Sequence, residues 1–211
     1  MTVVAAASPA YWDQAQRHLS RRDRVMRRLM PRFGPARLES RGDAFVTLAR
    51  SIVGQQISVK AAQSVWDRFA VLPHSMSPGA VLALETEPMR AAGLSGRKVE
   101  YLRDLALHFD EGRLSTDRWH AMEDEAIIRE LIVIRGVGRW TAEMFLIFHL
   151  LRPDVLPLDD AGLIRGISHN YFSGEPVSRS EAREVAQAWT PWCSVATWYM
   201  WRSLDPLPVT Y

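Results

Sequence analysis

The chain has 211 residues, of which 47% are hydrophobic and 24% charged, a balance typical of a globular protein and not of a disordered one. The net charge of +2 falls short of the strongly basic balance of many nucleic-acid-binding domains, and the single cysteine, Cys193, excludes an internal disulfide and an all-cysteine metal site. No apolar run approaches the ~20 residues of a membrane-spanning helix, and residues 1–9 lack the basic leader of a secretory signal, so we expect a cytoplasmic, bacterial protein with no membrane partner.

Positive charge is concentrated near the beginning of the chain, and arginine supplies it. The arginines of residues 17–50 are Arg17, Arg21, Arg22, Arg24, Arg27, Arg28, Arg32, Arg37, Arg41 and Arg50. They can form a solvated helix face or a surface that faces phosphate groups, and charge alone does not decide between the two.

Helical patterns follow one another along the whole chain, and no convincing alternating strand interrupts them. The expected helices span residues 10–28, 43–69, 89–94, 97–109, 123–134, 139–151, 159–171, 178–189 and 194–204. Residues 54–56, Gly-Gln-Gln, are expected to break the second pattern into two helices, and residues 73–78 to form a loop.

These elements predict an all-α fold with two helical lobes and the active site in the cleft between them. The central lobe is expected to span residues 43–151 and to include a helix–hairpin–helix at about residues 127–150. The second lobe combines residues 1–42 with residues 152–211.

The hairpin is the first candidate site. Gly136, Val137 and Gly138 separate two helices, and Arg139 and Thr141 follow in the first turn of the second. Glycine lets the backbone turn tightly, and the unpaired N–H groups at the start of a helix form a cradle for phosphate. Val137 can pack under both helices. A tight connection without any ligand explains the glycines equally well.

An aspartate pair, Asp159 and Asp160, follows the hairpin after a proline-containing connector. Either residue can cap the helix that begins there. If Asp160 carries chemistry, then Asp159 is expected to be the N-cap.

Three segments of the chain resemble the helix–hairpin–helix superfamily of DNA glycosylases. Within it the chain is most similar to the alkyladenine branch, the bacterial 3-methyladenine DNA glycosylase II type, in a short form. The segments are Gly138-Arg139-Trp140-Thr141-Ala142 with Asp160 at that branch's spacing, Pro191-Trp192-Cys193-Ser194 followed by Trp201, and residues 53–59 with their Gly-Gln-x-x-Ser pattern. The resemblance covers residues 43–204.

The resemblance assigns roles to named residues. It implies that Asp160 is catalytic, and that Trp140 and Trp201, with Met144 where the family often has tyrosine, line the pocket of the damaged base. Gln55 and Gln56 stand where a probe side chain fills the gap left by a flipped nucleotide. For Trp66, Trp119, Trp189, Trp192 and Trp198, core packing is the better interpretation.

The resemblance also implies what the chain does with damaged DNA. Relatives that cleave the strand carry a lysine at the position of Trp140, and the only lysines here are Lys60 and Lys98. We therefore expect a monofunctional hydrolase, a monomer, that flips and removes alkylated purines of the 3-methyladenine and 7-methylguanine type from double-stranded DNA in base excision repair.

Two alternatives remain open from the sequence: hypoxanthine, uracil, an oxidised base or 1,N6-ethenoadenine as the substrate, or a non-catalytic DNA-binding module. The histidines lack ligand spacing, so we expect no catalytic metal and no cofactor. The hairpin carbonyls of this family can hold a structural monovalent cation.

Overall fold

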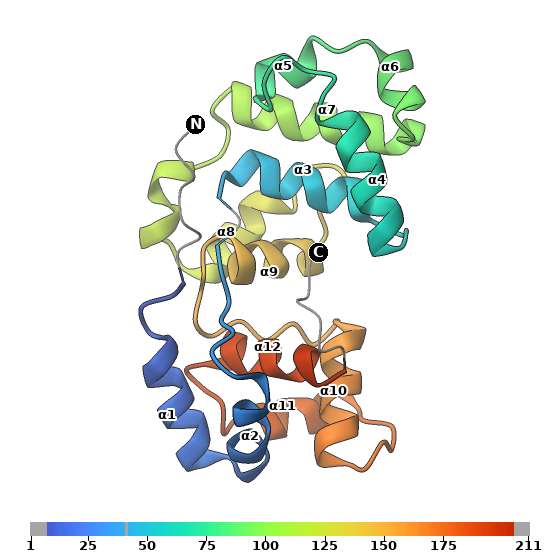
Figure 1. Cartoon of the computed structure of the whole chain (residues 1–211). Coiled ribbons are helices and arrows are strands. Elements are labelled where there is room, and N and C mark those ends of the chain that lie inside the picture. Colours follow the sequence, from blue (N-terminus) through green and yellow to red (C-terminus); the bar gives the residue numbers. More distant parts are fainter. Residues whose placement is uncertain (1–7, 41, 205–211) are drawn as a thin grey trace. The chain divides into compact units, whose positions relative to one another are not determined.

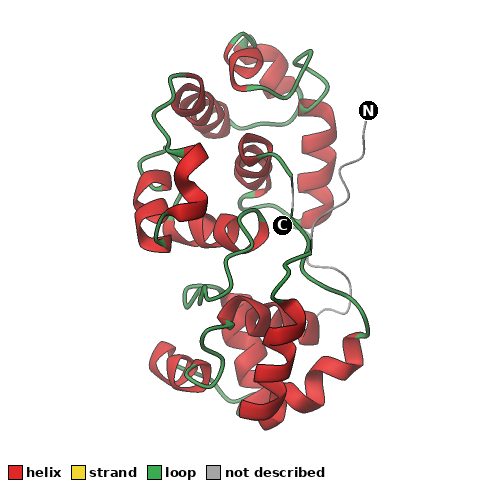
Figure 2. Cartoon of the chain, turned by 90° about the vertical axis from the view of Figure 1, so that its left-hand side faces the viewer, coloured by secondary structure: helices red, strands yellow, loops and turns green. Residues whose placement is uncertain are grey.

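The computed structural model describes residues 8–40 and 42–204, and all regular elements in these ranges are helices (Figure 2). This confirms the all-α prediction. None of the helices in the described ranges is long and apolar enough to cross a lipid bilayer.

The described chain divides into two compact units, the first formed by residues 8–40 and 146–204 and the second by residues 42–145. The boundary falls inside one helix, between Phe145 and Leu146, whereas the sequence interpretation placed it after residue 151.

The first unit is built around its last helix. Its elements are α1 (Trp12–Arg22), α2 (Arg24–Leu29), η1 (Met30–Phe33), α10 (Ala161–Tyr171), α11 (Arg179–Ala186) and α12 (Cys193–Leu204). In α12 every residue from Cys193 to Trp201 is buried, and the helix packs against α10, α1 and α2 (Figure 1). A Cβ on Gly166 of α10 would lie 2.9 Å from the carbonyl oxygen of Met200, so glycine is what allows α10 and α12 to approach this closely.

The single helix predicted for residues 10–28 is wrong, because Asp23 divides it into α1 and α2. The Asp23 backbone is extended, and its Oδ1 accepts hydrogen bonds from the backbone N–H groups of Val25 and Met26, as an N-cap does. Its Oδ2 accepts from the hydroxyl of Tyr171 at 2.6 Å and from Nε1 of Trp189 at 3.0 Å. The break in the helix therefore places a buried carboxylate where two distant aromatic residues donate to it.

The second unit is organised around a long helix, α7 (Gly96–Asp110), which packs against α3, α5 and α6 (Figure 1). Its other elements are α3 (Ala44–Gly54), α4 (Val59–Phe69), α5 (Pro78–Leu82), α6 (Thr86–Ala91), η2 (Thr116–Ala121), α8 (Asp124–Leu131) and the greater part of α9 (Arg139–Phe148). The predicted break is confirmed, since α3 ends at Gly54 and the Ser58 side chain caps α4. The sequence interpretation missed η2, whose Trp119 is buried and packs edge-on against Phe145.

Candidate functional site

The two glycines of the hairpin turn (residues 132–138) differ in their surroundings and in whether the position requires glycine. Gly136 has a φ of +84°, and a Cβ there would lie 2.2 Å from Cδ2 of Tyr101 in α7, so this position needs glycine twice over. A Cβ on Gly138 would meet open space, which leaves the start of α9 uncovered. Val137 between them is buried, as expected. A helix start that is open to solvent at Gly138 is a suitable place for a phosphate group.

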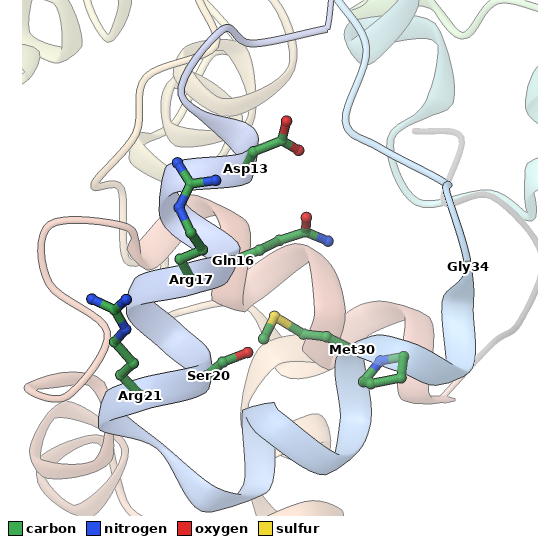
Figure 3. Close-up of a pocket in the computed structure, with 8 residues that line it drawn as sticks. Asp13, Gln16, Arg17, Ser20, Arg21, Met30 and Gly34 are labelled. Atoms are coloured by element: carbon green, nitrogen blue, oxygen red, sulfur yellow. The ribbon is translucent and has the colours of Figure 1, made fainter.

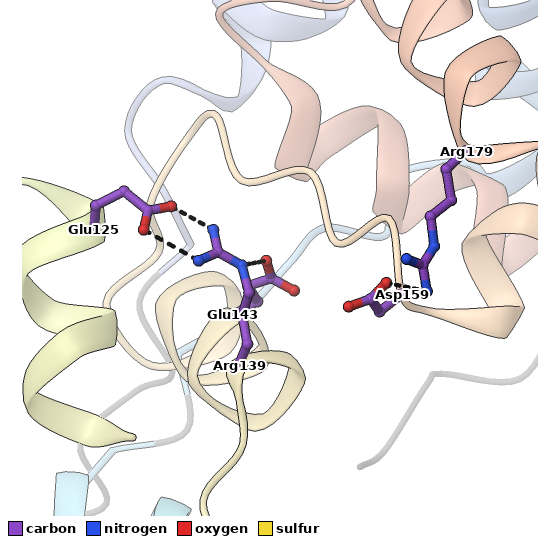
Figure 4. A network of polar contacts seen from close by, with 5 residues as sticks. All are labelled: Glu125, Arg139, Glu143, Asp159 and Arg179. Atoms are coloured by element: carbon purple, nitrogen blue, oxygen red, sulfur yellow. Dashed lines mark hydrogen bonds and ion pairs between the residues drawn. The ribbon is translucent and has the colours of Figure 1, made fainter. Parts of the chain in front are cut away.

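The side chain of Arg139 is engaged within the second unit, although the sequence placed it among the DNA-binding residues. Its guanidinium donates to both carboxylate oxygens of Glu125 in α8, and its Nε donates to Oε1 of Glu143 at 3.0 Å (Figure 4). The hydrogen bond from Arg139 holds the pKa of Glu125 below its ordinary value. Arg139 therefore ties the two helices of the hairpin together, and the cradle consists of backbone groups.

A cavity of about 500 Å³ lies beside the hairpin turn, inside the second unit, and this volume is typical of ligand pockets. Its lining includes the predicted residues Gln55, Gln56, Gly136, Gly138, Trp140, Thr141 and Met144. Trp140 is half-buried, while Thr141 and Met144 are buried. The structure thus brings the predicted hairpin, gap-filling residues and two of the three predicted pocket residues around one space.

Seven residues of the cavity wall were not predicted as site residues, and two of them interact with each other. Arg50 of α3 and Gln63 of α4 line the cavity, and the Arg50 side chain donates to Gln63 and lies over the ring of Trp66, 5.5 Å from its centroid. Arg50 lies one helical turn before Gly54, which places it on the same side of α3 as the cavity. That spacing is the signal that could have identified it.

The two glutamines of the gap-filling turn (residues 54–58) are held differently. Gln55 donates through Nε2 to the carbonyl oxygen of Gly136 at 2.8 Å, so its side chain is tied to the hairpin turn. Gln56 is exposed and has a φ of +60°, a left-handed conformation that non-glycine residues seldom adopt. Of the two, Gln56 is the side chain that is available to solvent.

Asp160 is the N-cap of α10 in the first unit and is only 5% exposed. Its Oδ1 accepts from the backbone N–H of Leu163 at 2.5 Å and from Nε1 of Trp201 at 2.7 Å. The expectation that Asp159 would be the N-cap is wrong: Asp159 is exposed and forms an ion pair with Arg179 at 2.5 Å (Figure 4). The carboxylate is therefore oriented by a helix start and by an indole N–H.

Trp201, predicted as a wall of the base pocket, is 2% exposed and stacks on Phe148 with the ring centroids 5.6 Å apart. The role that the structure supports for Trp201 is to donate a hydrogen bond to Asp160. Gly162 makes room for this contact, since a Cβ there would lie 3.0 Å from Oδ1 of Asp160 and 3.1 Å from Cδ1 of Trp201. Gly162 is a residue of the site that the sequence interpretation did not single out.

Four of the tryptophans assigned to core packing, Trp66, Trp119, Trp189 and Trp198, are buried, as predicted. Trp192 is only half-buried and stacks on Tyr11, so its assignment to the core is wrong.

The arginine-rich start of the chain borders a separate hollow of about 540 Å³ in the first unit. Figure 3 shows Gln16 and Ser20 of α1 pointing toward the side of Met30, whereas Arg17 and Arg21 point away from it. None of the predicted site residues lines this hollow. Over residues 8–40 and 42–204, no group of three or more His, Cys, Asp or Glu side chains could hold a metal ion.

Comparisons with known proteins agree with this arrangement. Residues 49–191 match the family model described as "HhH-GPD superfamily base excision DNA repair protein". The chain is 30% identical over 197 residues to DNA-3-methyladenine glycosylase 1 of Schizosaccharomyces pombe, an alignment that covers 90% of this chain and 86% of the relative.

Solved structures give the same result. The S. pombe 3-methyladenine DNA glycosylase in complex with abasic DNA superposes with a TM-score of 0.81 at 29% identity, covering 94% of this chain and 100% of that one. A DNA-3-methyladenine glycosidase from Bacillus halodurans gives 0.80 at 31% identity, covering 96% and 93%. The chain therefore belongs to the HhH-GPD superfamily of base excision DNA repair proteins.

Proposed function

We propose that this chain is a monofunctional DNA glycosylase that hydrolyses the N-glycosidic bond of alkylated purines, of the 3-methyladenine and 7-methylguanine type, in double-stranded DNA. The observation that carries the proposal is the oriented carboxylate of Asp160, held at the start of α10 by Leu163 and Trp201. Two relatives that share most of the chain's length, from S. pombe and B. halodurans, are named for 3-methyladenine in DNA, which supports the choice of substrate.

Hydrolysis of the N-glycosidic bond requires one anion beside the sugar. As the base departs, positive charge develops on the deoxyribose, and a carboxylate about 3.5 Å from C1′ stabilises it by roughly 4–5 kcal/mol at an effective dielectric of about 20, or about three orders of magnitude in rate. The same carboxylate can orient or deprotonate the attacking water. Alkylation at N3 or N7 makes the purine cationic and a good leaving group, so the protein needs to supply no strong acid.

The damaged base has to leave the helical stack before it can be cleaved. The cavity beside the hairpin turn offers the half-buried ring of Trp140 to a cationic base, and an aromatic face attracts a cation. Gln56 is exposed on the neighbouring turn, which supports a role for its side chain in filling the vacated position in the duplex. The uncovered start of α9 provides a grip on the phosphate backbone that does not depend on sequence.

Strand cleavage requires an amine that attacks C1′, and neither lysine is suited to this. Trp140 stands at the position of the lyase lysine. Lys98 donates to the carbonyl oxygens of Val53 and Gln55, both at 2.8 Å, so its amine is engaged with backbone. Lys60 is exposed on α4 and outside the cavity lining. We infer that the product is an abasic site in an intact strand.

The test is base release from a panel of duplexes that contain 3-methyladenine, 7-methylguanine, hypoxanthine, uracil or 1,N6-ethenoadenine. Wild type is expected to release the alkylated purines, and Asp160→Asn to release them about three orders of magnitude more slowly. Asp159→Asn is the matched control, because it removes the neighbouring carboxylate without touching α10's cap, and it is expected to behave as wild type.

The outcomes separate the alternatives. Release of uracil or hypoxanthine alone would replace the alkylpurine assignment. Salt-dependent binding to DNA without release of any base would make the chain a non-catalytic module. Equal rates for Asp160→Asn and wild type would overturn the catalytic assignment.

A further inference from the structure

One helix supports both turns that face the cavity of the second unit. Lys98, Tyr101 and Asp104 are spaced three residues apart on α7, so their side chains leave the helix on neighbouring faces. The Nζ of Lys98 donates to the carbonyl oxygens of Val53 and Gln55, both at 2.8 Å. These carbonyls lie at the end of α3, where the last C=O groups of a helix have no partner within it and where a cation complements the helix dipole.

The next two residues of the set reach the hairpin turn. The Tyr101 ring occupies the space that a Cβ on Gly136 would need. Asp104 Oδ2 accepts a hydrogen bond from the backbone N–H of Arg135 at 2.8 Å. The same helix therefore fixes the gap-filling turn at one point and the hairpin turn at two.

The two turns are also joined directly. The Gln55 side chain donates to the carbonyl of Gly136, while the Gln55 carbonyl accepts from Lys98. The residue that follows, Gln56, stands in the left-handed region, a conformation that persists only when its surroundings hold it. Lys98 supplies that hold on the N-terminal side of Gln56, because it binds the carbonyl of the peptide group that links Gln55 to Gln56.

We propose that Lys98 is a positioning residue for lesion recognition: it fixes the gap-filling turn so that Gln56 enters the duplex in register with the grip of the hairpin turn. The proposal rests on the DNA-glycosylase function. The desolvation that lowers the pKa of Lys98 is consistent with an ammonium group withdrawn into the protein for this purpose. The sequence analysis named Lys98 only as a lysine that does not lie at the lyase position.

The experiment compares wild type with Lys98→Met, and Arg103→Met is the matched control. Arg103 is also a cation on α7 and also donates to a backbone carbonyl, that of Leu84 at 2.9 Å, but Leu84 lies in the turn that follows α5. Insertion is followed with a duplex that carries 2-aminopurine beside an abasic analogue, because a base that loses its stacking becomes fluorescent. Excision of 7-methylguanine is measured under single-turnover conditions.

For Lys98→Met we expect single-turnover excision to fall about tenfold and the 2-aminopurine signal to fall with it, while the affinity for undamaged duplex stays within about twofold of wild type. Arg103→Met is expected to lose thermal stability and to keep both signals. Lys98→Gln, which retains an uncharged NH2 donor group, is expected to lie between wild type and Lys98→Met.

Unchanged insertion and excision in folded Lys98→Met would overturn the proposal, and so would an equal loss in Arg103→Met. If neither Lys98 variant folds, the residue serves the folding of the whole unit and the proposal fails. Because the abasic duplex requires no catalysis, the insertion signal still tests Lys98 if the wild-type chain releases no alkylated base, so the two proposals fail separately.

Discussion

The carboxylate of Asp160 is oriented by two donors that share one of its oxygens, and they come from different parts of the chain. The Leu163 N–H belongs to the first turn of the helix that Asp160 caps, whereas the Trp201 indole comes from α12. The first contact is a local consequence of an aspartate at a helix start. The second fixes the rotation of the carboxylate with respect to the core of the first unit, because the indole is itself stacked on Phe148.

Replacing Trp201 with phenylalanine separates its packing from its hydrogen bond. The ring of phenylalanine can still stack on Phe148, but it has no N–H for Asp160. A hydrogen bond to a charged group is worth about 1.5–3 kcal/mol, so we expect kcat for base release to fall about tenfold or more with little change in KM. Single-turnover and steady-state excision assays measure the two quantities.

Trp198→Phe is the control for this prediction, since Trp198 lies on the same helix and packs edge-on against Trp12 without contacting Asp160. It is expected to lower stability and to leave kcat near the wild-type value. If Trp201→Phe retained full kcat, the indole N–H would have no part in orienting the carboxylate.

At the scale of the helices, local signals predicted most of the architecture and the turns of the site. Three features each depend on a few neighbouring residues: the Gly-Gln-Gln break after α3, the glycine turn before α9 and the capping box at Ser178. Local signals allow either Asp159 or Asp160 to cap α10, and it is the resemblance to the family that singles out Asp160.

The features that the sequence did not reveal depend on partners far along the chain. Asp23 caps α2 locally, but the donors to its second oxygen, Tyr171 and Trp189, lie 148 and 166 residues away. The hydrogen bonds from Lys98 to the end of α3 span 43 and 45 residues. Neither pairing leaves a periodic or spacing signal, so only the packed fold could show them.

The hairpin's two helices are linked by the ion pair of Glu125 and Arg139, and this link should depend on pH. The hydrogen bond from Arg139 lowers the pKa of Glu125 in the folded state, so the stabilisation is present above the ordinary pKa of 4.5 and is lost as the pH falls through the lowered folded value. We expect Glu125→Gln to reduce the free energy of unfolding by about 0.5 kcal/mol near pH 7, as for other exposed pairs, and by almost nothing near pH 3.

Urea denaturation of both proteins at the two pH values measures this difference. Glu123→Gln is the control, because Glu123 is exposed at the start of the same helix and makes no capping hydrogen bond. A difference between wild type and Glu125→Gln that persists undiminished at the acidic pH would show that packing, and not charge, links the helices.

For the molecule as a whole, the distribution of charge suggests how tightly it holds undamaged DNA. The net charge is only +2, and the arginines of the hairpin are paired within the second unit: Arg135 with Glu100 at 2.9 Å, and Arg139 with Glu125 and Glu143. A hairpin that grips phosphate through backbone N–H groups releases few counterions. Weak electrostatic attraction to the phosphate backbone would let such a protein dissociate quickly from undamaged sites. Recognition of a lesion would then depend on the turns beside the cavity.

This predicts a shallow dependence of DNA affinity on salt. With about two to four phosphates neutralised, the logarithm of the binding constant for undamaged duplex should fall against the logarithm of salt concentration with a slope of about −2 to −4. The double variant Glu100→Gln, Glu125→Gln removes the exposed carboxylates that pair with Arg135 and Arg139, while Glu143 stays beside Arg139. Each of the two cations that then meets a phosphate should steepen the slope by about 0.9. Glu111→Gln frees Arg113, with which Glu111 forms an ion pair at the far end of α7, and should leave the slope as it is. Fluorescence anisotropy over a salt series measures all three. An unchanged slope in the double variant would mean that Arg135 and Arg139 already exchange their glutamates for phosphates when the wild-type protein binds DNA.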